Sequence, residues 1–358
     1  MTKIPISVCI IAKNEEKHIE QCLKHLIKYG MEIVVVDTGS EDATVELARK
    51  YTSNVYETEW KNSFSEARNY AAKQAKNNWI LVVDCDEYMQ EIDISKLRIC
   101  MQKYNKAVGM LNLNNMKTSP NGHVTYNMVK IPRFYNKNFY EFRFDIHEQI
   151  TPKGATDLQN VTLNTFEMPA VAEHHGYDIS KDEMLKKQER NLELLQEAVE
   201  NDRNDDYIYF QMGQSYIAIG RYQEALEAYE KCFSINESLE KEYMPIALKS
   251  YLELLIGSGQ YLKGYELASR YEDNLPTAYL WYLYGLSADR IGHAPKALMI
   301  FTKLTFRKDF EALGKKAYEV YAKILSLCKN VGDGEMMNYY RYRLVQYASE
   351  HGEQIKWA

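Results

Sequence analysis

The sequence predicts an α/β domain with a mostly parallel sheet over residues 1–178, followed by an all-α domain of repeated helices over residues 179–358. Two observations predict this organisation. Residues 5–90 alternate between apolar, β-branched runs and amphipathic helical stretches, which is typical of parallel strands joined by right-handed crossovers. After residue 180 the strand signals stop and an internal helical repeat begins. A chain of 358 residues is also long for a single hydrophobic core.

The first half is built from strands and helices in turn. Continuous apolar runs predict strands covered on both faces, at residues 5–12, 32–37 and 79–84. Apolar residues at helical spacing predict the intervening helices, at residues 15–30, 42–51 and 63–75. Gly30 is suited to end the first of these helices. From about residue 107 to 174 the strand signals become shorter and mixed.

The second half contains a repeat. Ser180 and Glu183 have the spacing of a capping box and predict the start of its first helix. Matching small and aromatic residues then recur 72 positions apart: Tyr209, Gly213, Tyr216, Gly220, Ala225 and Tyr229, and Trp281, Gly285, Ala288, Gly292, Ala297 and Phe301. A weaker unit lies between them with Gly259 at its turn, and a degenerate fourth unit covers about residues 318–347.

These repeats resemble the tetratricopeptide repeat, in which small residues let paired helices approach while aromatic rings fill the space between them. The resemblance implies a helical array whose units bury their faces only against neighbours. A plain helical bundle is the alternative.

Composition and charge exclude several classes of protein. A formal net charge of -6 argues against general nucleic-acid binding, which needs a basic surface. The longest apolar stretches are too short to span a bilayer, and no signal peptide is visible. None of the six cysteines forms a C-x-x-C pair, so neither a zinc ribbon nor a redox motif is indicated. We therefore expect a cytoplasmic protein with reduced thiols.

Carboxylates follow two of the predicted strands. Asp37 ends one strand, and Asp84 and Asp86 follow another in "WILVVDCDEYM". In an open α/β sheet, ligands bind beyond the carboxyl ends of the strands. Paired carboxylates there suit Mg²⁺ or Mn²⁺, which complete their shells with water and substrate phosphates. Neither a dinucleotide fingerprint nor a P-loop is present, and capping of the next turn is the structural alternative.

The order and spacing of several segments resemble glycosyltransferase family 2, the inverting GT-A type. The segments are "IIAKNEE" (10–16), "VVVDTGSEDAT" (34–44), "FSEARNYA" (64–71) and "ILVVDCDE" (80–87). Together with "DIHEQI" (145–150), "EHHGYDI" (173–179) and the trailing repeats, they resemble a bacterial subgroup that glycosylates peptides, proteins or cell-envelope glycans. The resemblance covers about residues 4–235.

The resemblance implies a role for each matching position. Asp37 would accept a hydrogen bond from the nucleotide base. Ala12, Asn14 and Glu15 would frame the base and ribose, although helix capping also explains Asn14 and Glu15. Arg68 would face the nucleotide or its diphosphate.

The resemblance also implies a metal centre and a general base. Asp86 would bind the metal directly, Asp84 would contact ribose or a metal-bound water, and His174, favoured over His175, would be a further ligand. Inversion needs one carboxylate to take the acceptor's proton, and Glu148 is the best candidate, with Asp145 in reserve.

His147 would orient Glu148 or contact the diphosphate. Lys130 and Arg133 either complete a basic rim or form a solvated face. Cys85 is expected to point back into the core.

The expected function is metal-dependent, inverting transfer of a hexosyl or N-acetylhexosaminyl group from a nucleotide-diphosphate sugar. UDP is the favoured nucleotide, Mn²⁺ or Mg²⁺ the expected cofactor, and a protein, peptide or glycan the acceptor. The helical repeats would recruit a protein acceptor or mediate self-association. Two alternatives stay open: a repeat-type interaction protein with a vestigial nucleotide-binding domain, and a nucleotidyltransferase.

Overall fold

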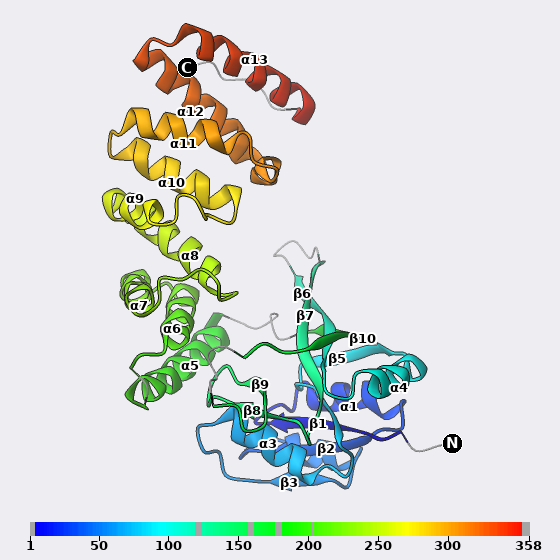
Figure 1. Ribbon diagram of the computed structural model, residues 1–358. Helices are drawn as coiled ribbons and strands as arrows, with labels where there is room; N and C mark the ends of the chain where they lie inside the picture. The colour runs from blue at the N-terminus through cyan, green and yellow to red at the C-terminus, as the bar shows by residue number, and fades with distance from the viewer. Residues whose placement is uncertain (1–3, 119–123, 157–160, 176–180, 202, 353–358) are drawn as a thin grey trace. The chain divides into compact units, whose positions relative to one another are not determined.

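The computed structural model describes residues 4–118, 124–156, 161–175, 181–201 and 203–352. Contacts along the chain divide it into two compact units, residues 1–198 and residues 199–358 (Figure 1). Helix α5 (Lys181–Asn201) begins within the first unit and ends at the start of the second. The domain boundary after residue 178 stays a prediction.

The first unit is built on an eight-stranded mixed sheet with the order β3-β2-β1-β4-β7-β6-β10-β5. Its strands are β1 (Ile6–Ala12), β2 (Glu32–Asp37), β3 (Val55–Glu57), β4 (Trp79–Val82), β5 (Glu87–Ile92), β6 (Val108–Thr118), β7 (Val124–Asn136) and β10 (Thr165–His174). Four of the seven strand pairs are parallel, so the expected α/β fold with a mostly parallel sheet is confirmed. β8 (Tyr140–Arg143) and β9 (Gln149–Pro152) form a separate antiparallel pair.

Helices cover both faces of this sheet, because the apolar side chains of β1 point alternately to the two faces and both sets need to be buried. Ile6, Val8 and Ile10 pack in one core, with residues of α1 (Ile19–Ile27) and α4 (Ile94–Lys103), while Cys9 faces the other. That second core includes residues of α3 (Phe64–Gln74). α2 (Thr44–Arg49) contacts α1. The two cores hold the strands rigidly, and the strand ends carry the polar loops described below.

The sequence signals and the structure differ where packing or polarity hides the pattern. The predicted strand at residues 32–37 is found as β2, whereas β4 ends at Val82 and the chain turns through Asp84. β6 and β7 are the longest strands of the sheet rather than short ones. Their outer parts lie beyond the cores, and in β7 the alternating apolar residues Val124, Tyr126 and Met128 are exposed, so they do not mark a buried face.

The second unit is a run of antiparallel helix pairs. Its helices are α6 (Asp206–Ala218), α7 (Tyr222–Ile235), α8 (Met244–Gly257), α9 (Tyr261–Ser269), α10 (Ala278–Arg290), α11 (Ala294–Leu304), α12 (Lys315–Val331) and α13 (Gly334–His351), with a short 3₁₀ helix at Phe310–Leu313. Gly220, Gly259 and Gly292 turn the chain between helices with φ near +80°. Each value lies in the left-handed region that favours glycine. The predicted capping residue Ser180 lies outside the described residues.

The recurring glycines are close-approach positions. A Cβ on Gly213 would lie 2.7 Å from the ring of Tyr229, and one on Gly285 would lie 2.6 Å from the ring of Phe301. The aromatic residue of the second helix therefore occupies the space that the glycine leaves in the first. The same contact in two pairs explains why both residues recur 72 positions apart.

None of the described helices combines the length and the apolar character that a membrane crossing requires.

This packing predicts that Gly213→Ala and Gly285→Ala each destabilise the helical unit by about 1–3 kcal/mol, because the added methyl group overpacks a fixed ring. Gly257→Ala is the matched control, since nothing lies within 4 Å of its Cβ and its φ is not positive. It should stabilise α8 by about 0.4–1 kcal/mol. Urea unfolding of the full chain measures all three, and equal effects at the three positions would contradict the close-approach account.

Candidate active site

Two loops at the carboxyl ends of β1 and β2 are locked together. Main-chain N–H groups of residues 14–16 donate to side chains of the second loop: Asn14 to Ser40 Oγ (2.8 Å), Glu15 to Thr44 Oγ1 (2.7 Å) and Glu16 to Asp42 Oδ2 (3.1 Å). Bonds in the other direction run from Glu41 N to Asn14 Oδ1 and from Ala43 N to Glu16 Oε2. Asn14 has a φ of +57°, in the left-handed region that asparagine tolerates better than most residues.

Asp37 lies at the base of the second loop, with its side chain turned inward. It is 3% exposed, and its Oδ2 accepts from the N–H groups of Gly39 (3.0 Å) and Ser40 (2.9 Å), while Oδ1 accepts from Ser40 Oγ. A cavity of about 540 Å³ lies beside it, lined by residues that include Asp42, Arg49 and Glu57. The carboxylate thus shapes the loop. A nucleotide base could donate only to the lone pairs of Asp37 that the loop does not use.

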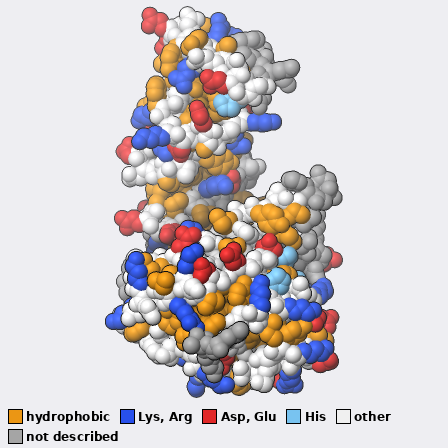
Figure 2. Space-filling view, turned by 90° about the vertical axis from the view of Figure 1, so that its right-hand side faces the viewer, with side chains coloured by type: hydrophobic (Ala, Val, Ile, Leu, Met, Phe, Trp, Pro, Cys, Tyr) orange, Lys and Arg blue, Asp and Glu red, His pale blue; other side chains and the backbone are white. Residues whose placement is uncertain are grey.

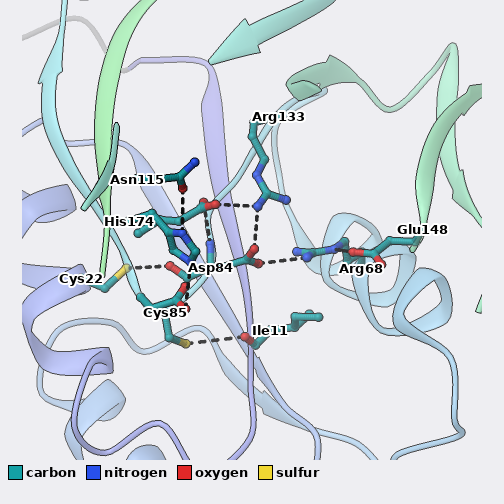
Figure 3. A network of polar contacts seen from close by, with 11 residues as sticks. Ile11, Cys22, Arg68, Asp84, Cys85, Asn115, Arg133, Glu148 and His174 are labelled. Carbon is teal, nitrogen blue, oxygen red and sulfur yellow. Dashed lines mark hydrogen bonds and ion pairs between the residues drawn. The ribbon is translucent and has the colours of Figure 1, made fainter. Parts of the chain in front are cut away.

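A chain of alternating charges begins at the end of β4. Asp84 Oδ1 accepts from Arg68 Nη2 (2.9 Å) and Oδ2 accepts from Arg133 Nη2 (2.6 Å). Arg68 also donates from Nε to Glu148 Oε1 at 2.6 Å, and Arg133 donates to Glu87. Figure 3 shows Asp84 between the two guanidinium groups, with Glu148 at the far side of Arg68. Four separate segments of the chain therefore meet through Asp84.

Charge and burial set the protonation of this network. Burial opposes ionisation of Asp84, but the guanidinium groups of Arg133 and Arg68 outweigh it and hold the pKa of Asp84 well below its usual range. Burial raises the pKa of Glu87, whose carboxylate also accepts from the N–H of Asp84 (3.0 Å). Asp84 is therefore ionised at any physiological pH, and both of its oxygens are occupied by arginines.

Asp86 faces His174, at the end of β10. His174 Nε2 lies 3.2 Å from Asp86 Oδ2, and its Nδ1 lies 3.0 Å from Asn115 Oδ1. Burial alone would lower the pKa of His174, but the bond to Asp86 outweighs it and the pKa is raised. His175 points elsewhere, with its ring stacked on Tyr88. Of the two histidines, His174 is the one that contacts Asp86 through its side chain.

These residues fit a divalent cation. Both ring nitrogens of His174 face oxygen atoms, so an ion between Asp86 Oδ2 and Nε2 would take the place of a proton. The surrounding charge also favours a cation: the four carboxylates of Asp84, Asp86, Glu87 and Glu148 face only two guanidinium groups. No cluster of three His, Cys, Asp or Glu ligands occurs among the described residues, so further ligands would come from substrate and water.

Glu15 feels the same excess of negative charge. Burial is the main cause, and the nearby carboxylates of Asp86 and Asp84 add to it; together they raise the pKa of Glu15 to about 7. Its main-chain N–H belongs to the locked loops, and its side chain is close enough to Asp86 and Asp84 to be affected by their charge.

The candidate base lies in a strained turn before β9. Phe144 and His147 have φ values of +71° and +53°, in a region that bulky residues rarely adopt. Burial lowers the pKa of His147, which is therefore neutral at pH 7. Glu148 is held by Arg68 with its side chain 13% exposed, whereas the side chain of Asp145 is exposed. The turn brings Glu148, and not Asp145, into the charge network.

Some site residues were weighted too little or missed by sequence reasoning. Arg133 is one of the two partners of Asp84, while Lys130 pairs with exposed Glu167. Neither Asn115 nor the structural role of Glu87 had a signal in the sequence. Ala12 contributes its carbonyl oxygen, which accepts from Thr38 N (2.9 Å). Cys85 is buried, as expected, and burial raises the pKa of its thiol.

The pKa of Glu15 predicts a pH dependence of stability. The carboxyl group of Glu15 ionises near pH 4.5 in the unfolded chain and near pH 7 in the folded protein. Burying it therefore does not lower the free energy of unfolding below pH 4.5 and lowers it fully above pH 7. Glu15→Gln should therefore raise the unfolding temperature more at pH 8 than at pH 5, in metal-free buffer. Thermal unfolding at the two pH values tests this, and a Glu15→Gln effect independent of pH would contradict it.

Comparisons with known proteins give a match in each of the two units. Residues 7–152 match the model of glycosyl transferase family 2, and residues 207–239 match a tetratricopeptide repeat. A TPR repeat-containing protein of Synechococcus elongatus is 26% identical over 223 residues, covering 62% of this chain and 54% of the relative. The SPbeta prophage-derived glycosyltransferase SunS of Bacillus subtilis is 27% identical over 241 residues, covering 65% and 54%.

A further relative is the lipopolysaccharide core biosynthesis glycosyltransferase LpsC of Rhizobium meliloti, 27% identical over 164 residues, which cover 42% of this chain and 59% of the relative. Among solved structures, S. aureus TarS 1-349 in complex with UDP has a TM-score of 0.37 and 14% identity, over 82% of this chain and 88% of that one. The chain spans about half the length of the first two relatives. It carries a glycosyl transferase family 2 domain followed by helices of the tetratricopeptide repeat type.

Proposed function

We propose that the protein is a metal-dependent, inverting glycosyltransferase that moves a sugar from a nucleotide-diphosphate donor, with UDP favoured, to a protein, peptide or cell-envelope glycan acceptor. The observation that carries this proposal is the network at the end of β4, where Asp84, both arginines, the Asp86–His174 pair and Glu148 meet. It lies at the carboxyl ends of parallel strands, where α/β sheets bind ligands. The family match supports the same chemistry.

The nucleotide would lie over the locked loops of β1 and β2. Asp37, the carbonyl of Ala12 and the residues Asn14 and Glu15 surround this part of the sheet edge. The 540 Å³ cavity beside Asp37 is within the usual size range of small-molecule sites. Because the loops are fixed by reciprocal hydrogen bonds, binding costs little ordering of the protein.

Asp86 and His174 would hold the Mn²⁺ or Mg²⁺ ion. When bound, the ion neutralises the negative charge that develops on the departing diphosphate. Arg68 and Arg133 add positive charge next to it. Arg68 Nη1 and Arg133 Nε are buried without a hydrogen-bond partner among the described residues, so the guanidinium groups are not saturated by the protein. A phosphate group suits such donors.

Glu148 would act as the general base. Its Oε1 is engaged by Arg68, which keeps the carboxylate oriented and leaves Oε2 for the acceptor. In the transfer step the acceptor oxygen forms a bond to the anomeric carbon as the bond to the diphosphate breaks. The acceptor proton passes to Glu148 and the electron pair leaves with the nucleoside diphosphate. Inversion follows because attack and departure occur on opposite faces of the carbon.

The helical unit is the part of the chain suited to a protein partner. Its match to a tetratricopeptide repeat favours recruitment of a protein acceptor or self-association. The alternative of an interaction protein with a vestigial first domain is less well supported, because a vestige has no need of a base held by a buried arginine. On the face shown in Figure 2, basic and acidic side chains are interspersed, which does not favour a nucleic-acid partner.

The proposal predicts nucleotide binding that depends on a metal. UDP with Mn²⁺ should raise the unfolding temperature of the full chain, whereas UDP with EDTA should not; at about 100 times the dissociation constant the stabilisation is about 2.7 kcal/mol. GDP, CDP and TDP complete the panel. Asp86→Asn should abolish the shift, and the control Glu91→Gln, at an exposed carboxylate of β5, should retain it. No shift with any nucleotide in the wild-type protein would refute the proposal.

A further inference from the structure

One edge of β7 has no partner over most of its length. β4 pairs with β7 only from Trp79↔Asn136 to Leu81↔Phe134. β4 then ends, and the chain turns through Asp84 to β5, which lies at the far end of the sheet. Between Val124 and Arg133, β7 pairs with β6 on one side, and no strand of the described chain pairs with its other side. Main-chain N–H and C=O groups on that side can bind another strand.

This open edge begins at the candidate active site. Arg133 is the neighbour of Phe134, which forms the last pair between β7 and β4. The guanidinium group of Arg133 donates to Asp84 at 2.6 Å. A strand laid along the edge would continue the line that β4 leaves at Val82. Figure 1 shows the β6–β7 hairpin extending beyond the ends of its neighbours. The edge therefore leads from Asp84 away from the sheet.

The side chains along this edge are apolar on one face. Val124, Tyr126 and Met128 alternate along β7 and are 38%, 58% and 62% exposed. Val129 and Ile131, on the opposite face, pack on the core of the first unit. A long open edge with exposed apolar side chains is a hazard that proteins usually cover or break with charge. Here the apolar stripe remains next to the site, which indicates a partner that covers it in function.

We propose that the acceptor is a polypeptide segment in extended conformation that adds as a strand to the open edge of β7. This rests on the proposed transferase function and names the class of its acceptor. The peptide main chain would pair with β7, and apolar side chains at every second position would cover Tyr126 and Met128. The end of the peptide beside Arg133 and Asp84 would bring its acceptor side chain to the network that holds Glu148.

A peptide fits this edge better than a glycan or a lipid. The edge offers main-chain donors and acceptors on every second residue, except that Pro132 has no N–H, and only another main chain matches this regular pattern along its length. Residues 124–133 can thus align a segment of about ten residues. A glycan would meet the polar groups irregularly and leave the apolar stripe exposed.

The test selects peptides of about ten residues from a random phage-displayed library on the full-length protein with UDP and Mn²⁺. We expect selected peptides to slow amide hydrogen exchange in residues 124–133 of β7. The double variant Tyr126→Ser/Met128→Ser should weaken their binding about tenfold or more, because two apolar contacts are lost. Ile99→Ser on α4, at a side chain 62% exposed, is the matched control and should bind as the wild type does.

Five outcomes overturn the inference. An affinity of the double variant for the selected peptides equal to that of the wild type would show that Tyr126 and Met128 do not bind them. Protection outside residues 124–133 would place the peptide elsewhere. A failure to select any peptide while UDP and Mn²⁺ still stabilise the protein would leave the transferase in place but exclude a peptide acceptor. A dimer in light scattering that dissociates in the double variant would assign the edge to a second copy of the chain. Loss of the UDP shift itself would refute the proposed function as well.

Discussion

The position of Asp84 between Arg68 and Arg133 is the constraint on which the candidate site depends. The two arginine side chains are 7% and 15% exposed, and guanidinium groups so placed need an anionic partner. Asp84 provides it because β4 ends two residues earlier and the chain turns there. Removing one partner from such a buried pair costs about 3–5 kcal/mol, since the other charge is left uncompensated. The network is thus a structural constraint on the candidate site.

This constraint joins parts of the chain that are far apart in sequence. Arg68 comes from α3, Arg133 from β7 and Glu148 from the turn before β9, and each is fixed through Asp84. The turn that carries Glu148 also contains Phe144 and His147, whose φ values are positive. Because the turn of β4 also ends its pairing with β7, the active-site network and the open edge of β7 have a common origin.

Sequence reasoning was most successful where a residue's role follows from its position on a strand. Continuous apolar runs located β1 and β2, and the ends of predicted strands pointed to Asp37, Asp84 and Asp86. The repeat was readable because a close approach demands glycine opposite an aromatic ring. These patterns are local, or recur at a fixed interval, so they need no knowledge of the tertiary structure.

Other features depend on contacts that no local pattern records. Arg133 lies 49 positions after Asp84, and an arginine in a half-exposed strand gives no sign of its partner. The bond from His174 to Asn115 joins β10 to β6, whose adjacency follows from the strand order alone. Packing and topology decided both cases.

The most direct test of the central claim is the rate at which UDP is released from UDP-glucose and UDP-N-acetylglucosamine, with Mn²⁺ and water as the acceptor. If Glu148 is the base held by Arg68, Glu148→Gln should slow release by about a hundredfold or more while leaving UDP affinity unchanged. Glu141→Gln, on neighbouring β8, should release UDP at the wild-type rate. Equal rates in the wild type and Glu148→Gln would show that the network does not perform the proton transfer.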